Sequence, residues 1–292
     1  MSGPTSPSQF ELGRPSELLK RFGVRPRKGL GQHFLVSRSH LARIVGAAEL
    51  GPSNVVLEVG PGLGVLTDAL ARRAGRVVAV EIDPGMRRIL GETLRQHKNV
   101  EVVAADVLKV DPAALIGAPP APERIEPGYK VVANLPYNIT SAAIRHLLEA
   151  PVKPERSVLM LQREVADRIL ATPGDMSILA VAVQFYATPS LVTTVPAGAF
   201  HPRPKVDSAV LSLDTHSALP VDVRDTKLFF RLVRAGFGQK RKQLRNSLAA
   251  GLGLDTAAAA ALLESAGIDP RRRAQTLSLE EWSRLAAVAD SL

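Results

Sequence analysis

The segment Val55–Gly64, with the sequence VVLEVGPGLG, constrains the fold of this chain most strongly. Four of the five residues from Val55 to Val59 are apolar and three are β-branched, a pattern that predicts a short buried strand. The glycines that follow, Gly60, Gly62 and Gly64, have no Cβ atom, so the chain can turn tightly and bring its amides close to a ligand. A helical pattern begins at about Val65. This order of strand, glycine loop and helix is typical of a doubly wound α/β sheet, in which nucleotides bind at the loop.

Two acids follow the next two predicted strands. Val77–Val80 ends in Glu81, which lies 21 positions after Gly60, close to the spacing at which an acid meets a ribose. A carboxylate accepts hydrogen bonds from both ribose hydroxyls. A third strand, from Asn99 to Ala105, ends in Asp106, which is suited to the exocyclic amine of an adenine or, equally, to a helix cap or a solvated turn. The pattern favours a nucleoside-type cofactor over a purely structural glycine turn.

The predicted fourth strand, Lys130 to Ala133, leads into Asn134-Leu135-Pro136-Tyr137. An adenine N6 amine is a poor nucleophile because its lone pair is delocalised into the ring. The side-chain oxygen of Asn134 and the backbone carbonyl of Pro136 are acceptors that can hold this amine so that its lone pair meets an electrophilic methyl group. Tyr137 offers an aromatic face to an unstacked base. The alternative is a plain turn after a strand, but a position on the same sheet edge as the glycine loop favours catalysis.

The composition narrows the class of partner. The chain has 292 residues, a net charge of +9 and a pI of about 10.2, which favours a polyanion such as nucleic acid over a neutral ligand, although a basic soluble surface is the alternative. It contains no cysteine, and its six histidines are scattered, so we expect neither disulfides nor a metal site. No apolar run is long enough for a membrane span, and no signal peptide is apparent. These features predict a cytoplasmic protein.

The whole chain divides into three predicted parts. Residues 1–16 are expected to be a flexible tail, residues 17–216 an α/β domain and residues 217–292 a small all-α domain. Proline and alanine from Pro112 to Gly128 indicate a surface loop. In the stiff loop from Phe200 to Ser208, Phe200 is a candidate for stacking on a base, and Arg203 and Lys205 are candidates for binding phosphate; a rigid connection is the alternative. The helical part carries a further cluster of candidate RNA-binding cations, which includes Lys240, Arg241 and Arg245.

From about Lys28 to the C-terminus the chain resembles the rRNA adenine N6-dimethyltransferase family, and most closely its bacterial small-subunit branch. The segments that carry the resemblance are Gly31-Gln32-His33-Phe34-Leu35, Leu57-Glu58-Val59-Gly60-Pro61-Gly62, Glu81-Ile82-Asp83, Ala105-Asp106-Val107, Asn134-Leu135-Pro136-Tyr137, Phe200-His201-Pro202-Arg203-Pro204-Lys205-Val206, Phe237-Gly238-Gln239-Lys240-Arg241-Lys242 and Leu244-Arg245-Asn246-Ser247-Leu248. The resemblance implies a Rossmann-like class I methyltransferase fold with a mostly parallel seven-stranded sheet.

The resemblance also implies a cofactor, S-adenosylmethionine, and a role for each matched residue. Gly60 and Gly62 would lie by the methionine part of the cofactor, Glu81 would hold the ribose and Asp106 the adenine amine. The side chains that would close the pocket are His33 and Leu35, and Asn134 would lie between cofactor and target base. His33 departs from the family, which usually has Asn at this position; because both side chains donate and accept hydrogen bonds, we expect binding to survive.

The reaction implied is dimethylation of N6 on each of two adjacent adenosines in the 3′-terminal hairpin loop of 16S rRNA. The partner would be this rRNA within the small ribosomal subunit or its precursor, and the protein would act as a monomer. Three alternatives stay open: a sister group that dimethylates large-subunit rRNA and confers macrolide resistance, a non-catalytic assembly factor, and a nicotinamide dehydrogenase. The last explains the glycine loop and Glu81, but neither the Asn134 motif nor the basic helical part.

Overall fold

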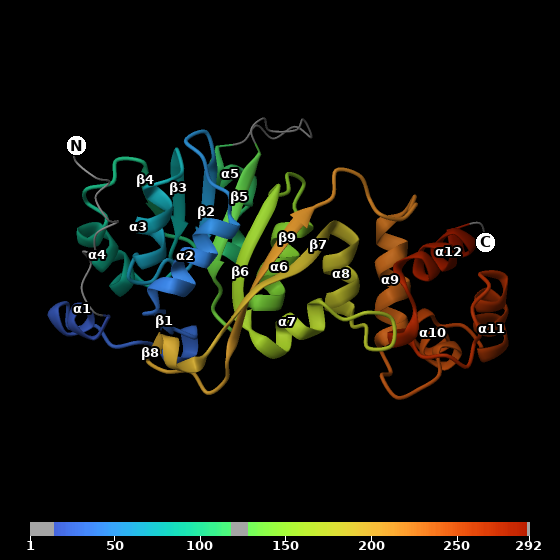
Figure 1. Cartoon of the computed structure of the whole chain (residues 1–292). Coiled ribbons are helices and arrows are strands. Elements are labelled where there is room, and N and C mark those ends of the chain that lie inside the picture. The colour runs from blue at the N-terminus through green and yellow to red at the C-terminus, as the bar shows by residue number, and fades with distance from the viewer. Residues whose placement is uncertain (1–14, 118–127, 291–292) are drawn as a thin grey trace, which may run out of the picture. The chain divides into compact units, whose positions relative to one another are not determined.

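The structure is a computed structural model that describes residues 15–117 and 128–290 (Figure 1). Its strands are β1 (Phe34–Leu35), β2 (Val55–Val59), β3 (Arg76–Val80), β4 (Val100–Val103), β5 (Tyr129–Asn134), β6 (Arg156–Gln162), β7 (Ala187–Val195), β8 (Phe200–His201) and β9 (Ser208–Thr215). Its α-helices are α1 (Pro15–Arg21), α2 (Arg38–Ala47), α3 (Val65–Ala71), α4 (Pro84–Thr93), α5 (Pro112–Ile116), α6 (Thr140–Leu148), α7 (Arg163–Ile169), α8 (Ile178–Tyr186), α9 (Thr226–Phe237), α10 (Leu244–Leu252), α11 (Thr256–Ser265) and α12 (Leu279–Asp290).

Seven strands form one sheet in the order β4-β3-β2-β5-β6-β9-β7, and Figure 1 shows the first four side by side. The pairs β4–β3, β3–β2, β2–β5 and β5–β6 are parallel. Parallel neighbours need crossover helices on the faces of the sheet, which explains the alternation of strands and helices along the chain. The predicted α/β class with a mostly parallel seven-stranded sheet is therefore confirmed.

The strand register brings the predicted functional residues to one edge. Val59 of β2 pairs with Val80 of β3, and Val80 pairs with Val103 of β4. The strands are in register at their carboxyl ends, so the residues immediately after them, Gly60 and Glu81, become neighbours. A ligand-binding crevice at this edge is the usual outcome in open α/β sheets.

The described chain divides into two compact units. One comprises residues up to Arg163 together with Leu191–Leu213, and the other comprises Glu164–Ser190 and the chain from Asp214 onward. The predicted boundary at residue 216 differs from this division because residues 164–190 pack with the C-terminal helices. Phe185 of α8 lies 4.7 Å from Phe229 and 5.2 Å from Phe230 of α9, measured between ring centroids.

Each unit has its own core. In the first, α2 and α3 pack on the sheet through buried side chains such as Ile44, Leu70 and Val77. In the second, Trp282 of α12 lies in a core built from α8 to α12, and this core also contains Phe185 and Phe229; all three side chains are fully buried. Burial of such aromatic side chains is a large part of the driving force for folding a small helical unit.

Two local predictions are wrong. Helix α5 occupies residues 112–116 of the segment predicted as a loop, because Asp111 caps it by accepting from the amide of Ala113; residues 118–127 lie outside the described part. Helix α1 includes residues 15 and 16 of the predicted tail, and its Leu18 and Leu19 are buried; residues 1–14 also lie outside the described part.

Candidate functional site

A cavity of about 280 Å³ opens at the carboxyl ends of the parallel strands, within the first unit. Eight of the residues predicted from the sequence line it: His33, Leu35, Gly60, Gly62, Glu81, Asp106, Asn134 and Pro136. The N-terminal segment from Leu30, the glycine loop and the strand tips up to Ile139 supply nearly the whole wall, and Met160 of β6 adds to it. Of the other predicted residues, Tyr137, Phe200, Arg203 and Lys205 do not line it, and Lys240, Arg241 and Arg245 belong to the other unit.

The glycine loop has a left-handed backbone that only glycine adopts readily. Gly60, Gly62 and Gly64 have φ angles of 67°, 58° and 85°. A Cβ atom on Gly62 would lie 2.9 Å from the ring of Phe34, and one on Gly60 would lie 3.5 Å from the ring of Pro136. The loop is thus in close contact with both the N-terminal segment and the Asn134 motif.

Glu81 is buried, and its two carboxylate oxygens accept hydrogen bonds from different amides. Oε1 accepts from the amide of Asp83 at 2.8 Å, and Oε2 accepts from the amide of Gly62 at 3.3 Å. Burial raises the pKa of Glu81, and these two hydrogen bonds oppose the rise. Each oxygen retains a further lone pair for a ligand hydroxyl. The acid is therefore fixed against the glycine loop before any ligand enters.

Asn134 is oriented by the N-terminal segment. Its side-chain Nδ2 donates to the backbone carbonyl of His33 at 2.9 Å. Because that partner is a carbonyl, the nitrogen must be the donating end, and Oδ1 is left as the acceptor in a residue that lines the cavity. This is the orientation that holding an amine requires.

The carbonyl of Pro136, predicted as a second acceptor, is already engaged. It accepts from the amide of Ile139 and from Thr140 Oγ1, each at 3.1 Å, in the turn that starts α6. Both lone pairs are used, so the predicted role needs the Thr140 hydroxyl to turn away. The sequence could not indicate this, because the competition arises from the turn geometry.

Tyr137 and His33 pack on each other beside the cavity. Their rings are stacked with centroids 5.6 Å apart, and the His33 ring is hydrogen-bonded through Nδ1 to the carbonyl of Pro202 at 2.8 Å. The Tyr137 hydroxyl and the buried hydroxyl of Ser208 share a hydrogen bond of 2.7 Å. Burial raises the pKa of Tyr137, so it stays neutral. One face of the Tyr137 ring is thus covered by His33.

The structure contradicts the prediction that Phe200 stacks on a base. It is 4% exposed, pairs with Leu35 through the short β1–β8 ladder and belongs to the core under α2. A base cannot stack on a ring that packing already covers. Its contribution is to hold the N-terminal segment in place, whereas Arg203 and Lys205 in the following loop are exposed.

The basic residues of the second unit lie at the start of α10 and the turn before it. Lys240 and Arg241 are exposed, while Arg245 is half-buried with a buried Nε that has no hydrogen-bond partner. All three remain candidates for RNA contact.

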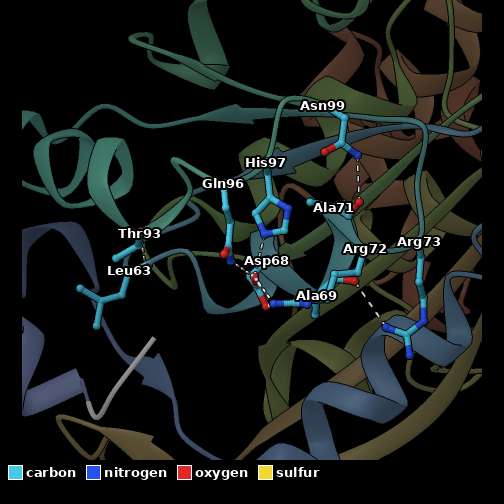
Figure 2. A network of polar contacts seen from close by, with 10 residues as sticks. All are labelled: Leu63, Asp68, Ala69, Ala71, Arg72, Arg73, Thr93, Gln96, His97 and Asn99. Atoms are coloured by element: carbon cyan, nitrogen blue, oxygen red, sulfur yellow. Dashed lines mark hydrogen bonds and ion pairs between the residues drawn. The ribbon is translucent and has the colours of Figure 1, made fainter. Parts of the chain in front are cut away.

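A polar network holds the helix that follows the glycine loop (Figure 2). Asp68 of α3 accepts from His97 Nε2 at 2.7 Å and from Gln96 Nε2 at 3.4 Å, both beyond the end of α4. Thr93 Oγ1 donates to the carbonyl of Leu63 in the loop itself. Because α3 begins at the glycine loop and α4 begins just after Glu81, these contacts fix the two ligand-binding segments relative to each other.

Glu58 is a residue of the site to which the sequence pattern assigned no role. It lines the cavity, is 1% exposed, and its Oε2 has no hydrogen-bond partner. Burial raises its pKa to about 8, and repulsion from Glu81 contributes. An acid inside an otherwise apolar strand was the signal that could have identified it.

The described residues contain no group of three or more His, Cys, Asp or Glu side chains that could hold a metal ion. Within the same ranges, no single helix is long and apolar enough to cross a membrane. One bent pair, Leu244–Leu252 with Thr256–Ser265, meets the criteria of length and composition together, but both helices contribute to the core of the second unit.

Comparison with known proteins gives consistent matches over nearly the whole chain. Residues 23–290 match the family model described as "Ribosomal RNA adenine dimethylase". The chain is 48% identical over 277 residues to ribosomal RNA small subunit methyltransferase A of Dehalococcoides mccartyi, covering 95% of this chain and 93% of that one. It is 47% identical over 277 residues to the protein of the same name from Moorella thermoacetica, covering 94% and 96%.

Two solved structures are also similar to this chain over most of its length. The 23S rRNA methyltransferase ErmE is 33% identical, with a TM-score of 0.66 over 88% of this chain and 99% of that one. A dimethyladenosine transferase from Plasmodium falciparum is 24% identical, with a TM-score of 0.71 over 89% and 98%, a likeness that shows the shared fold. The predicted family is confirmed: this chain belongs to the ribosomal RNA adenine dimethylases.

Proposed function

We propose that this enzyme transfers methyl groups from S-adenosylmethionine to N6 of two adjacent adenosines in the 3′-terminal hairpin loop of 16S rRNA, during maturation of the small ribosomal subunit. The observation that carries the proposal is the placement of Asn134, with its amide oxygen free to accept, in the same cavity as Glu81 and the glycine loop. The relatives named small subunit methyltransferase A support the choice of rRNA.

The donor set of the cavity suits the proposed cofactor. Glu81 presents oxygens for ribose hydroxyls, and the Asp106 side chain, which accepts from the amide of Leu108 at 3.1 Å, retains acceptors for an adenine amine. Gly60 and Gly62 line the cavity, and they carry no Cβ atom that would press on Pro136 or Phe34, so the loop backbone can lie close to the methionine part. When bound, S-adenosylmethionine supplies an electrophilic methyl group on a sulfonium centre.

The protein contributes alignment. Asn134 Oδ1 accepts one N6–H of the target adenine, which directs the nitrogen lone pair toward the methyl carbon. With the cofactor bound, N6 would take the methyl group and the cofactor sulfur would be the leaving group, and the surplus N6 proton would pass to solvent. The target base must leave its stack to reach the cavity, at a cost of a few kcal/mol that is smaller in a loop than in a duplex. The proposed substrate implies action in the cytoplasm, and we further propose that a single copy of the chain acts on it.

The test uses purified protein, S-adenosylmethionine and small subunits that lack the modification, followed by digestion of the rRNA and mass spectrometry of its nucleosides. We expect N6,N6-dimethyladenosine from the 3′ hairpin. The variant Asn134→Ala should lose nearly all methyl transfer while binding the cofactor with similar affinity in calorimetry, and wild-type turnover in it would refute the role given to Asn134.

The likeness to ErmE makes large-subunit rRNA the second candidate substrate. If N6,N6-dimethyladenosine formed only with large-subunit rRNA, that rRNA would be the substrate. Subunit binding without any methylated adenosine would indicate a non-catalytic assembly factor.

A further inference from the structure

A strongly basic surface lies on the first unit, apart from the strand tips. We call it the α1/α4 face and define it by Lys20, Arg21, Arg25, Arg27, Arg87, Arg88 and Arg95. These residues belong to α1, to the chain that follows it, and to α4 and its C-terminal end. Only two acids of α1 and α4 are exposed beside these seven cations, Glu17 and Glu92.

Packing brings these two distant parts of the chain together (Figure 1). Leu18 and Leu19 of α1 share a buried cluster with Met86 and Ile89 of α4. At the surface, Arg88 Nη2 donates to the carbonyl of Phe22 at 2.8 Å. Cations separated by some 60 residues of sequence therefore lie on one surface.

Three of these cations have side chains without a partner among the residues that the structure describes. Arg21 pairs with Glu92 at 3.0 Å, and Arg87 donates to the carbonyls of Glu81 and Ile82. The side chains of Lys20, Arg25 and Arg95 are exposed and make no hydrogen bond or ion pair within the part of the chain that the structure describes. Mutual repulsion among like charges makes such a surface unfavourable by itself, and an external polyanion relieves it.

A groove between α1 and α4 accompanies the charge. It has a volume of about 570 Å³ and is lined by Arg21, Phe22 and Arg95 among others. Arg21 lies over the Phe22 ring, 5.3 Å from its centroid. The groove thus offers guanidinium groups in a concave surface, the arrangement that binds phosphate well.

Hydrogen bonds connect this face to the wall of the cofactor cavity. The amide of Arg27 donates to Gln32 Oε1 at 2.8 Å, and Gln32 Nε2 donates to Asp83 Oδ2 at 3.0 Å. Arg27 Nε lies 3.5 Å from the same carboxylate oxygen of Asp83, and Gln32 lines the cavity. An RNA whose target base enters the cavity therefore has backbone close to this face.

We infer that the α1/α4 face binds the phosphate backbone of the substrate rRNA outside its target loop, as an anchor separate from the basic helices of the second unit. This inference rests on the proposed function. RNA is the polyanion that the active site itself brings to this surface, and its regularly spaced phosphates match a row of cations without requiring base contacts.

The experiment compares two triple variants of the full-length protein. Lys20→Gln, Arg25→Gln and Arg95→Gln together remove the three unpaired cations. Arg73→Gln, Arg168→Gln and Arg224→Gln together remove the same charge from exposed positions outside the face. Binding to unmodified small subunits is measured by filter retention across a salt series, with thermal melting and calorimetric binding of S-adenosylmethionine as controls of folding.

We expect the α1/α4 variant to bind subunits at least about tenfold more weakly at low salt, and the slope of log K against log salt to become less steep by about 2. The control variant should keep the wild-type slope, and both should bind the cofactor normally. Equal slopes in the two variants would overturn the inference about the α1/α4 face. The proposed function would stand, provided that the wild-type protein still methylates the rRNA. Failure of the wild-type protein to bind small subunits would overturn both this inference and the proposed substrate.

Discussion

Replacing Glu58 with glutamine tests the least expected feature of the site. The carboxyl lies under the glycine loop, is 1% exposed and leaves Oε2 without a hydrogen-bond partner. Burial raises its pKa from 4.5 to about 8, so it is protonated in the folded protein at neutral pH and ionised in the unfolded chain. Glutamine has nearly the same shape but does not titrate.

The sign and size of the effect follow from proton linkage. Between pH 4.5 and 8 the folded state of the wild type binds about one proton more at Glu58 than the unfolded state does. The Glu58 contribution to the free energy of unfolding therefore falls as pH rises, by up to about 1.4 kcal/mol per pH unit. From pH 5.5 to 7.5 the variant should gain up to roughly 3 kcal/mol relative to wild type, or about 5–10 °C in melting temperature.

The assay is thermal and urea unfolding of both proteins at pH 5.5, 6.5 and 7.5, followed by fluorescence and circular dichroism. Taking the difference between variant and wild type at each pH cancels the other titrating groups and any constant effect of the amide. A difference that stays the same across the series would mean that Glu58 is already ionised in the folded protein, and would refute the argument from burial.

Three further predictions concern the same unit. Gly62→Ala should weaken binding of S-adenosylmethionine at least about tenfold in calorimetry, because the φ of Gly62 is positive and the added Cβ atom would meet Phe34. The control variant Gly91→Ala, whose added Cβ atom meets open space, should bind the cofactor normally and be no less stable than the wild type. Asp68→Ala should lower the free energy of unfolding by about 1–3 kcal/mol in urea at pH 7, because it leaves the His97 side chain, which is 11% exposed, without its hydrogen-bond partner. Burial raises the pKa of Asp68, but hydrogen bonds from its neighbours lower this pKa overall. In the wild type the stabilisation by the Asp68 carboxylate is therefore present above pH 3.8 and is lost as pH falls through the depressed pKa. A variant that is equally destabilised at pH 3 and pH 7 would contradict this. Tyr137→Phe should cost about 1 kcal/mol of stability, since the buried hydroxyl bonded to it loses its partner, and unchanged urea midpoints would argue against that bond.

Local patterns were sufficient to predict the parallel sheet and most of the cavity wall. Val55–Val59 and the glycines after it are recognisable because strand, turn and helix each follow from neighbouring residues. Glu81 was found because the length of one βαβ unit fixes where the next strand ends. Parallel register then brings these ends together, so proximity of Gly60 and Glu81 follows from secondary structure alone.

Predictions failed where contacts between distant segments decide the outcome. Phe200 has the sequence context of an exposed loop, but its pairing with Leu35, 165 positions earlier, buries it. The predicted acceptor role of Pro136 stays a prediction, but it now requires the Thr140 hydroxyl to turn away, because two donors in the next turn take the lone pairs of the Pro136 carbonyl.

The sequence by itself therefore determined the fold class, because short-range periodicity and spacing encode it. The family, and cavity residues such as His33 and Leu35, followed from the resemblance of its motifs to a known family. Only the tertiary structure decided which of their atoms are free to act. The amide oxygen of Asn134 is available because its nitrogen is bonded to a carbonyl 101 positions earlier in the chain. The charge of Glu58 depends on its burial beneath the glycine loop, and the α1/α4 face exists only because two helices far apart in sequence share a core. Hydrogen-bond satisfaction, desolvation and summed charge are properties of three-dimensional neighbours, and a linear pattern does not specify them.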